Sequence, residues 1–243
     1  MAGHSKWANI KHRKGRNDAV RSKVTAKIAK EITVAVKIGG SDPTGNMKLK
    51  LALQKARENN IPKENIQRAI QKGAGNLDGA SYEEIMYEGY GPGGVAVLIE
   101  TATDNRNRTA ADIRYLFSKH SGNLGESGCV GWMFKQKGTF LIEKNDKIDE
   151  ETLMDIVLNA GAEDIIEEDD TFEILSAPTD FEAIQDALEG NNIEVTRASI
   201  SMIPDTTVAL QGEEAEKLLK LIDALEDNDD VQEVYANFDI PDD

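Results

Sequence analysis

The segment NDAVRSKVTAKIAKEITVAVKI, residues 17–38, decides how the first part of the chain folds. At 100° per residue, its apolar side chains fall on one arc of a helix and its basic side chains on the opposite arc. The apolar arc holds Val20, Val24, Ile28, Ile32, Ala35 and Val36, and the basic arc holds Lys23, Lys27, Lys30 and Lys37, with Arg16 just before them. Gly39 and Gly40 suit the end of such a helix. The segment therefore predicts a helix with one packing face and one positively charged face.

The charge around this helix favours a functional interpretation of its basic face. The chain of 243 residues has a formal net charge of -16. Residues 1–75, however, carry 17 basic against five acidic side chains, a net of +12, and the remaining residues carry 11 against 39, a net of -28. Lysines on an outer helix face are often only solvated, which is the alternative. A basic module joined to an acidic body favours a polyanionic partner bound at one end.

Two further helices are expected in the basic part of the chain. Residues 46–59 form the first, and a second begins at Pro62 and closes at Lys72 and Gly73. Three helices joined by short turns predict a small bundle, and a helix-turn-helix is an alternative that the spacing does not identify. Its positive surface is widened by Lys48, Lys50, Lys55, Arg57, Lys63 and Arg68. Residues 73–81, GAGNLDGAS, have the composition of a linker.

Strand patterns begin after the linker. Residues 82–88 alternate, residues 95–102 are apolar enough for a central strand, a helix follows from about residue 109 to 119, and residues 127–134 are expected to form a short strand. Residues 138–203 have the order βαββαβ, which is typical of ferredoxin-like domains. Strands at 206–210 and 231–238, around a helix at 213–225, are expected to join residues 82–134 and complete a second α/β sandwich.

These patterns predict an α+β protein: an N-terminal three-helix bundle followed by two α/β sandwich domains, the last ferredoxin-like and inserted in the middle one. The predicted boundaries are 1–78 for the basic helical domain, 79–136 plus 204–243 for the middle domain, and 137–203 for the inserted domain. Three independent domains in sequential order are the competing topology.

The sequence carries no recognisable motif for catalysis, cofactor binding or membrane insertion. The spacing GYGPGG matches no phosphate-binding loop, Cys129 lies in an apolar stretch, and the acidic residues 163–170 match no calcium loop. The sequence thus predicts a protein that is not an enzyme, with no catalytic residues, no metal and no cofactor. No apolar run approaches the roughly 20 residues of a membrane span. We expect a cytoplasmic protein with no membrane partner, and its oligomeric state is left open.

The candidate nucleic-acid-binding residues are cations that could hold phosphate. Those of the N-terminal arm are Lys6, Lys11, Arg13, Lys14 and Arg16, and those of the central helix are Lys23, Lys27 and Lys30. Arg106 and Arg108 precede a helix N-terminus, where backbone N–H groups favour an anion. These two arginines and Arg114 have a structural alternative, because they could equally pair with Asp104, Asp112 and other carboxylates.

Several stretches together resemble the YebC/PmpR family, whose mitochondrial members include the translational activator of cytochrome oxidase. The matching pieces are AGHSKWANIKHRK at 2–14, NNIPKENIQRAIQKG at 59–73, YEGYGPGGVAVLIE at 87–100, TDNRNRTAADIR at 103–114 and GNLGESGCVGWMF at 122–134. The resemblance covers essentially the whole chain, and its first and fourth motifs are the most specific.

The resemblance implies a cytoplasmic, DNA-binding transcriptional regulator with an N-terminal helical domain and two α/β domains, one inserted in the other. It also implies a rival role, because some members of this family act on the ribosome as translation factors. The partner expected is therefore DNA or, alternatively, the ribosome with its rRNA and tRNA. The basic arm and the central helix suit both partners, since both are rich in phosphate. The sequence offers no set of side chains that would read bases.

Overall fold

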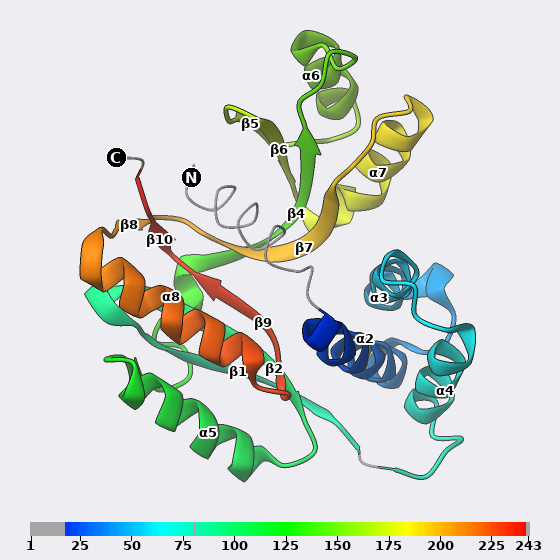
Figure 1. The fold of residues 1–243 in the computed structure, drawn as a ribbon. Coiled ribbons are helices and arrows are strands. Elements are labelled where there is room, and N and C mark those ends of the chain that lie inside the picture. Colours follow the sequence, from blue (N-terminus) through cyan, green and yellow to red (C-terminus); the bar gives the residue numbers. More distant parts are fainter. Residues whose placement is uncertain (1–17, 80, 242–243) are drawn as a thin grey trace. The chain divides into compact units, whose positions relative to one another are not determined.

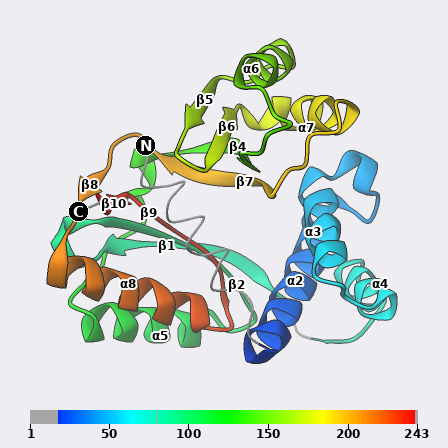
Figure 2. The ribbon, with the colours of Figure 1, turned by 45° about the horizontal axis from the view of Figure 1, so that its top comes forward.

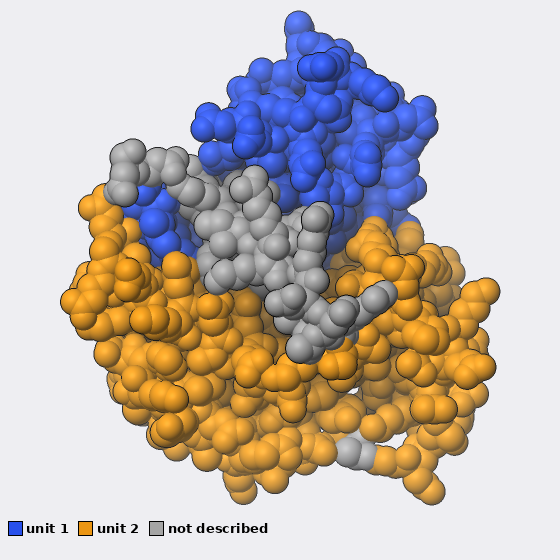
Figure 3. All heavy atoms as spheres, viewed as in Figure 1, with its two compact units in different colours: residues 1–10, 132–209, 237–243 blue, residues 11–131, 210–236 orange. Residues whose placement is uncertain are grey.

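The computed structural model describes residues 18–79 and 81–241. Helices accompany two four-stranded antiparallel sheets, which confirms the α+β class (Figure 1). Among the described residues, contacts divide the chain into two compact units, coloured separately in Figure 3. Of these residues, one unit holds 132–209 and 237–241, and the other holds 18–79, 81–131 and 210–236. The helical segment thus shares a unit with the middle sheet, and the three predicted domain boundaries stay a prediction.

The helical module, which we define as residues 18–76, contains α2 (Asp18–Gly39), α3 (Met47–Glu58) and α4 (Lys63–Gly73), with a short 3-10 turn η1 (Pro43–Gly45) between the first two. Asn46 fixes the start of α3, because its side-chain oxygen accepts from Leu49 N and its Nδ2 donates to Ala35 O at 2.8 Å. That amide therefore joins two helices as well as capping one. The shared core contains Ile28, Ile32, Ala35, Val36, Leu49, Ala52, Ala56, Ile61 and Ala69.

Helix α2 is buried beyond the apolar arc that its sequence predicts. Thr33 and Val34 are also buried, and Thr33 Oγ1 donates to Ala69 O across the contact with α4. Helix α2 contacts strand β2 (Ala96–Thr103) in addition to α3 and α4. A helix that packs on more than one neighbour keeps only part of its circumference for solvent.

The middle sheet has the strand order β3-β1-β2-β9, with every neighbouring pair antiparallel. Its strands are β1 (Glu83–Tyr90), β2, β3 (Asn123–Leu124) and β9 (Val231–Ala236). Strand β2 is buried along nearly its whole length, as a central strand should be. Helices α5 (Arg106–Lys119) and α8 (Gly212–Asp227) lie side by side along this sheet (Figures 1 and 2). Pairing of β2 with β9 joins segments that lie far apart in the chain.

The second sheet has the order β5-β6-β4-β7. Its elements follow the chain as β4 (Phe134–Glu143), α6 (Glu150–Asn159), β5 (Asp164–Glu167), β6 (Thr171–Ser176), α7 (Phe181–Gly190) and β7 (Arg197–Pro204). This is the split βαβ arrangement of ferredoxin-like domains. Phe140 of β4 stacks on Phe181 of α7 with ring centroids 4.6 Å apart, which ties the sheet to its helical layer.

The expected strand at residues 127–134 is wrong. The chain there forms a loop and the 3-10 turn η3 (Gly131–Met133), and β4 begins only at Phe134. The reason is the buried carboxylate of Glu88, which accepts hydrogen bonds from the backbone N–H groups of Gly128, Val130 and Gly131. These three donors are therefore satisfied without a strand partner.

The tail also differs from its prediction at one strand. Strand β8 (Val208–Ala209) pairs in parallel with β10 (Phe238–Asp239) and forms a separate two-stranded sheet. The strand expected at residues 206–210 is therefore shorter, at Val208–Ala209, and pairs outside the middle sheet. The helix and the strand expected after it are present as α8 and β9, and β9 pairs within the middle sheet. The short apolar pattern carried no signal for its pairing partner.

Candidate nucleic-acid interface

The basic row of α2 faces an acidic turn at the other end of the sequence. This acidic turn, residues 226–230, links α8 to β9 and has the sequence EDNDD. Lys23 Nζ lies 2.7 Å from Asp227 Oδ1, and Lys27 Nζ donates to the backbone oxygen of Glu226. Spacings of four residues along α2 place these lysines on one side of the helix, so both reach the same turn.

Lys30 extends this row to the end of the acidic turn. Its Nζ donates to Asp229 O at 2.9 Å and lies 3.5 Å from Asp230 Oδ1, and both side chains of the pair with Asp230 are largely buried. The same ammonium lies 5.0 Å from the centre of the Tyr82 ring. Three lysines that the sequence assigned to phosphate are therefore occupied by contacts within the chain.

The pKa values of two lysines in this row shift in opposite directions because their surroundings differ. The hydrogen bond to Asp227 raises the pKa of Lys23 above its ordinary value. Burial lowers the pKa of Lys27, although the nearby carboxylates of Glu226, Glu233 and Asp229 act in the opposite direction. The aliphatic stem of Lys27 thus contributes to packing while its ammonium satisfies a carbonyl at the end of α8.

Asp230 gathers more of the predicted cations than any other carboxylate described. It is 5% exposed, and both its oxygens lie 3.0 Å from Nη2 of Arg108. Thr109 Oγ1 donates to the same carboxylate at 2.9 Å. Arg108 also lies 2.9 Å from Asp104, which lowers the pKa of that carboxyl group. Arg108 and Lys30 therefore share one buried acid, which gives both a structural role.

The other two arginines of α5, Arg106 and Arg114, have separate surroundings. The guanidinium of Arg106 makes a two-point contact with Glu83, with Nε and Nη2 at 3.2 and 3.1 Å from the two carboxylate oxygens. This contact is well exposed to solvent. Arg114 lies further along α5, is exposed, and forms no ion pair with any residue in the described part of the chain. The group of three is thus not one anion site.

Exposed cations without an ion pair occur on α3 and α4. Within residues 18–79 and 81–241, no carboxylate pairs with Arg57, Lys63 or Arg68, and all three are exposed. They were expected to widen the positive surface but were not among the chosen site residues. Their neighbours differ: Lys48 pairs with Glu84, and Lys55 pairs with Glu31. Local sequence carries no signal that separates these cations, because the partners of the others come from distant segments.

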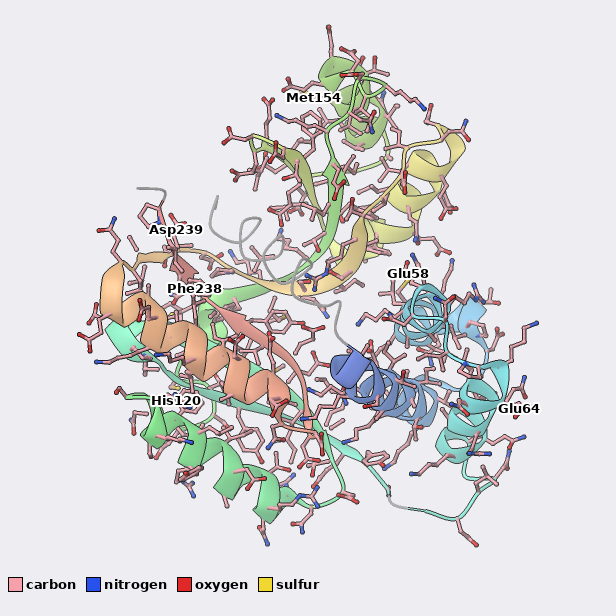
Figure 4. The ribbon with its side chains drawn as sticks, viewed as in Figure 1. Glu58, Glu64, His120, Met154, Phe238 and Asp239 are labelled. Atoms are coloured by element: carbon pink, nitrogen blue, oxygen red, sulfur yellow. The ribbon has the colours of Figure 1, made fainter. Side chains whose placement is uncertain are left out.

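Acidic side chains interrupt this basic surface without neutralising it. Glu58 at the end of α3 and Glu64 in the first turn of α4 are exposed and are labelled in Figure 4. Glu58 accepts a hydrogen bond from Gln54 at 3.1 Å. Glu64 lies where the helix dipole favours a carboxylate. Both therefore have local functions that leave the three cations available.

The five cations of the N-terminal arm, Lys6, Lys11, Arg13, Lys14 and Arg16, lie outside the described residues. In the part that is described, no cluster of three or more His, Cys, Asp or Glu side chains could hold a metal ion. The same part contains no helix long and apolar enough to cross a membrane. Burial raises the pKa of the Cys129 thiol, which disfavours the thiolate that nucleophilic chemistry needs.

Comparison with known proteins adds the family to this geometry. The family model described as TACO1/YebC protein N-terminal domain matches residues 5–76, and the one described as TACO1/YebC second and third domain matches residues 82–238. The chain belongs to the TACO1/YebC family. The split at residues 76–82 falls at the linker that leads from the helical module to β1.

Relatives in the TACO1/YebC family align along their full lengths. A probable transcriptional regulatory protein of Carboxydothermus hydrogenoformans is 59% identical over 244 residues, with 100% of each chain covered. One of Natranaerobius thermophilus is 55% identical and covers 100% of this chain and 98% of its own. Both names designate a regulatory protein, and neither describes an enzyme. The resemblance inferred from the sequence motifs is thereby confirmed.

A solved structure supports the fold of this TACO1/YebC chain. A conserved hypothetical protein of Aquifex aeolicus is 44% identical, and each chain is covered to 98% with a TM-score of 0.87. Because 98% of this chain is covered, the matched region includes both sheets and the helical module.

Proposed function

We propose that this protein is a DNA-binding regulator of transcription whose helical module and N-terminal arm hold the phosphates of the duplex. The observation that carries the proposal is the exposed set of Arg57, Lys63 and Arg68 on α3 and α4, which has no ion pair among the described residues. A cation without an acidic partner can bind phosphate without first losing a contact. The counterions condensed on the DNA at that phosphate are released in the same step.

Charge segregation and the family support the same proposal. The helical module and the arm belong to the segment of net +12, whereas the rest of the chain has a net charge of -28. Repulsion by the acidic body would orient a polyanion towards the basic end. Relatives that align over the full length are named probable transcriptional regulatory proteins, and such a role requires contact with DNA or with a factor bound to it.

The cations chosen from the sequence have unequal parts in this proposal. The five cations of the arm remain proposed phosphate contacts. Lys23, Lys27 and Lys30 are given a secondary part, because each would have to leave the acidic turn before it could reach phosphate. Arg106 and Arg108 would likewise have to leave Glu83 and Asp230. The three cations of α3 and α4 can contact phosphate without first leaving an ion pair among the described residues.

The test is the salt dependence of duplex binding by the full chain. Each phosphate contact contributes about 0.9 to the slope of log K against log salt, so Arg57→Ala, Lys63→Ala and Arg68→Ala together should make the slope shallower by about 2.7. The matched control removes three cations from the acidic body, namely Lys135, Lys217 and Lys220. The control should keep the wild-type slope. Equal slopes for the two triple variants would refute the role of α3 and α4.

A second arm of the experiment addresses the ribosome as the rival partner. Labelled duplex from promoter regions is incubated with the protein while unlabelled ribosomes are added at near-physiological salt. DNA binding that survives this competition and prefers some sequences supports a transcription regulator. The opposite result would be that ribosomes displace the protein from every duplex, and that the triple variant of Arg57, Lys63 and Arg68, the α3–α4 variant, no longer binds ribosomes. The protein would then be a translation factor that uses the same cations.

A further inference from the structure

Helix α5 has an outer face that the fold does not use. Its inner face buries Thr109, Ile113 and Phe117 in the core of the middle sheet. The opposite face exposes Asn107, Ala111, Arg114, Tyr115, Ser118 and Lys119. The helix ends at Lys119, and its C-cap residue, His120, is labelled in Figure 4. None of the intramolecular contacts described above for Arg106 and Arg108 lies on this outer face.

Tyr115 is the most exposed tyrosine among the described residues. Its side chain is 61% exposed, compared with 38% for Tyr90, and the other three tyrosines are half-buried. An aromatic ring left in water forgoes the stabilisation that its burial would give. Two neighbours of the ring on the helix surface, Ala111 and Ser118, are small and exposed, so much of the ring remains in contact with water.

Two cations share the outer face of α5 with this ring. Lys119 Nζ lies 5.8 Å from the centre of the Tyr115 ring, one helical turn away. Arg114 is adjacent in sequence, is exposed, and pairs with no carboxylate in the part of the chain that the structure describes. The nearest acid on the same helix, Asp112, is half-buried and accepts from the Asn228 amide. The outer face of α5 is therefore positive in a part of the sequence whose net charge is -28.

We propose that the outer face of α5 binds a single-stranded nucleic acid, with a base stacked on Tyr115 and phosphates held by Arg114 and Lys119. Exposed aromatic rings that lie on a positively charged surface are what non-specific single-strand binders use. A duplex fits less well, because the faces of its bases are covered by their neighbours in the stack. An acidic peptide would satisfy the cations but would leave the ring without a partner of matching shape.

This surface is separate from the cations of α3 and α4. The inference therefore goes beyond the proposed function, and each can fail while the other stands. It predicts that the full chain binds single strands through a helix of the acidic body, where charge alone would oppose binding. The stacked base supplies the part of the affinity that does not depend on salt.

The test measures binding of the full chain to fluorescein-labelled 12-mers of uridine and of deoxythymidine by anisotropy. Tyr115→Leu should weaken binding about tenfold, whereas Tyr115→Phe, which keeps the ring, should stay within about twofold of wild type. Arg114→Gln with Lys119→Gln should make the salt slope shallower by about 1.4, at roughly 0.7 per contact for a single strand. Lys217→Gln with Lys220→Gln on α8 is the control and should change neither.

Three results would overturn the inference. The first is that the wild-type protein binds neither 12-mer. The second is that Tyr115→Leu binds as tightly as wild type, and the third is that Tyr115→Phe binds as weakly as Tyr115→Leu. A duplex probe in parallel separates this surface from the proposed function, because Tyr115→Leu should leave duplex binding unchanged and the α3–α4 triple variant should weaken it. Equal loss on both probes in Tyr115→Leu would also contradict a single-strand site. Unchanged circular dichroism melting shows that the exposed substitutions leave the fold intact.

Discussion

Replacing Glu100 by glutamine should change how the stability of the protein depends on pH. Glu100 lies on β2 opposite Glu233 of β9, and Lys48 Nζ is 3.9 Å from its carboxylate. Burial raises the pKa of Glu100 from 4.5 to about 7, against the opposing effect of Lys48. At roughly 1.4 kcal/mol per pKa unit, this rise corresponds to about 3 kcal/mol.

The sign follows from which state binds the proton more tightly. The folded protein holds the Glu100 proton with the raised pKa, so its contribution to stability is complete below pH 4.5 and is lost as pH rises through about 7. Glutamine imitates the protonated acid and does not titrate. Glu100→Gln should therefore exceed the wild-type free energy of unfolding by less than about 1 kcal/mol at pH 5, and by about 3 kcal/mol at pH 8.

Urea unfolding followed by circular dichroism at pH 5, 6, 7 and 8 measures this difference directly. Glu126→Gln is the control, because Glu126 is exposed on a loop of the same compact unit. Its difference from wild type should stay small at every pH. The reasoning about Glu100 would be refuted by a difference between Glu100→Gln and wild type that does not grow with pH, since a buried ionised carboxylate must destabilise the fold more than its neutral form.

Three further predictions concern the packing around the site. Asp230→Ala should lower the free energy of unfolding by about 3 kcal/mol in urea titrations, because the Arg108 guanidinium and the Thr109 hydroxyl lose the buried carboxylate that they contact. The control, Asp227→Ala, removes an exposed ion pair with Lys23 and should leave the urea midpoint unchanged. Glu88→Ala should release the loop that its carboxylate organises and raise the rate of Cys129 reaction with a disulfide reagent about tenfold, and an unchanged rate would contradict that role. Gly73→Ala should destabilise the helical module by about 1 to 3 kcal/mol in thermal melts, because its Cβ would lie 2.5 Å from a backbone oxygen of α2.

The acidic turn changes how the basic character of α2 should be interpreted. Lys23 and Asp227 are 204 residues apart in sequence, and Arg108 and Asp230 are 122 apart. A count of charge over residues 1–75 includes these lysines, although the fold supplies their counter-charges from the other end of the chain. The cations that remain exposed and unpaired are consequently fewer than the net charge of the segment indicates.

Local patterns predicted most of the elements well. The period of apolar residues and the Gly39–Gly40 stop gave α2 to within one residue at each end, and Asn46 caps α3 as a side chain of its type should. The βαββαβ order and the α+β class also followed from the periods alone. Failures occurred where a distant group set the conformation, as Glu88 does for the loop around Gly128 and Val130.

The sequence by itself determined most of the helices and strands, the segregation of charge and the family, because each depends on neighbouring residues or on motifs read along the chain. Only the tertiary structure decided which cations are available. Lys27 and Lys63 are chemically alike, but the first contacts the end of α8 and the second is exposed without an ion pair in the described part. The physical reason is that the availability of a charge depends on the carboxylates that approach it in space, and these arrive from segments about 200 residues away.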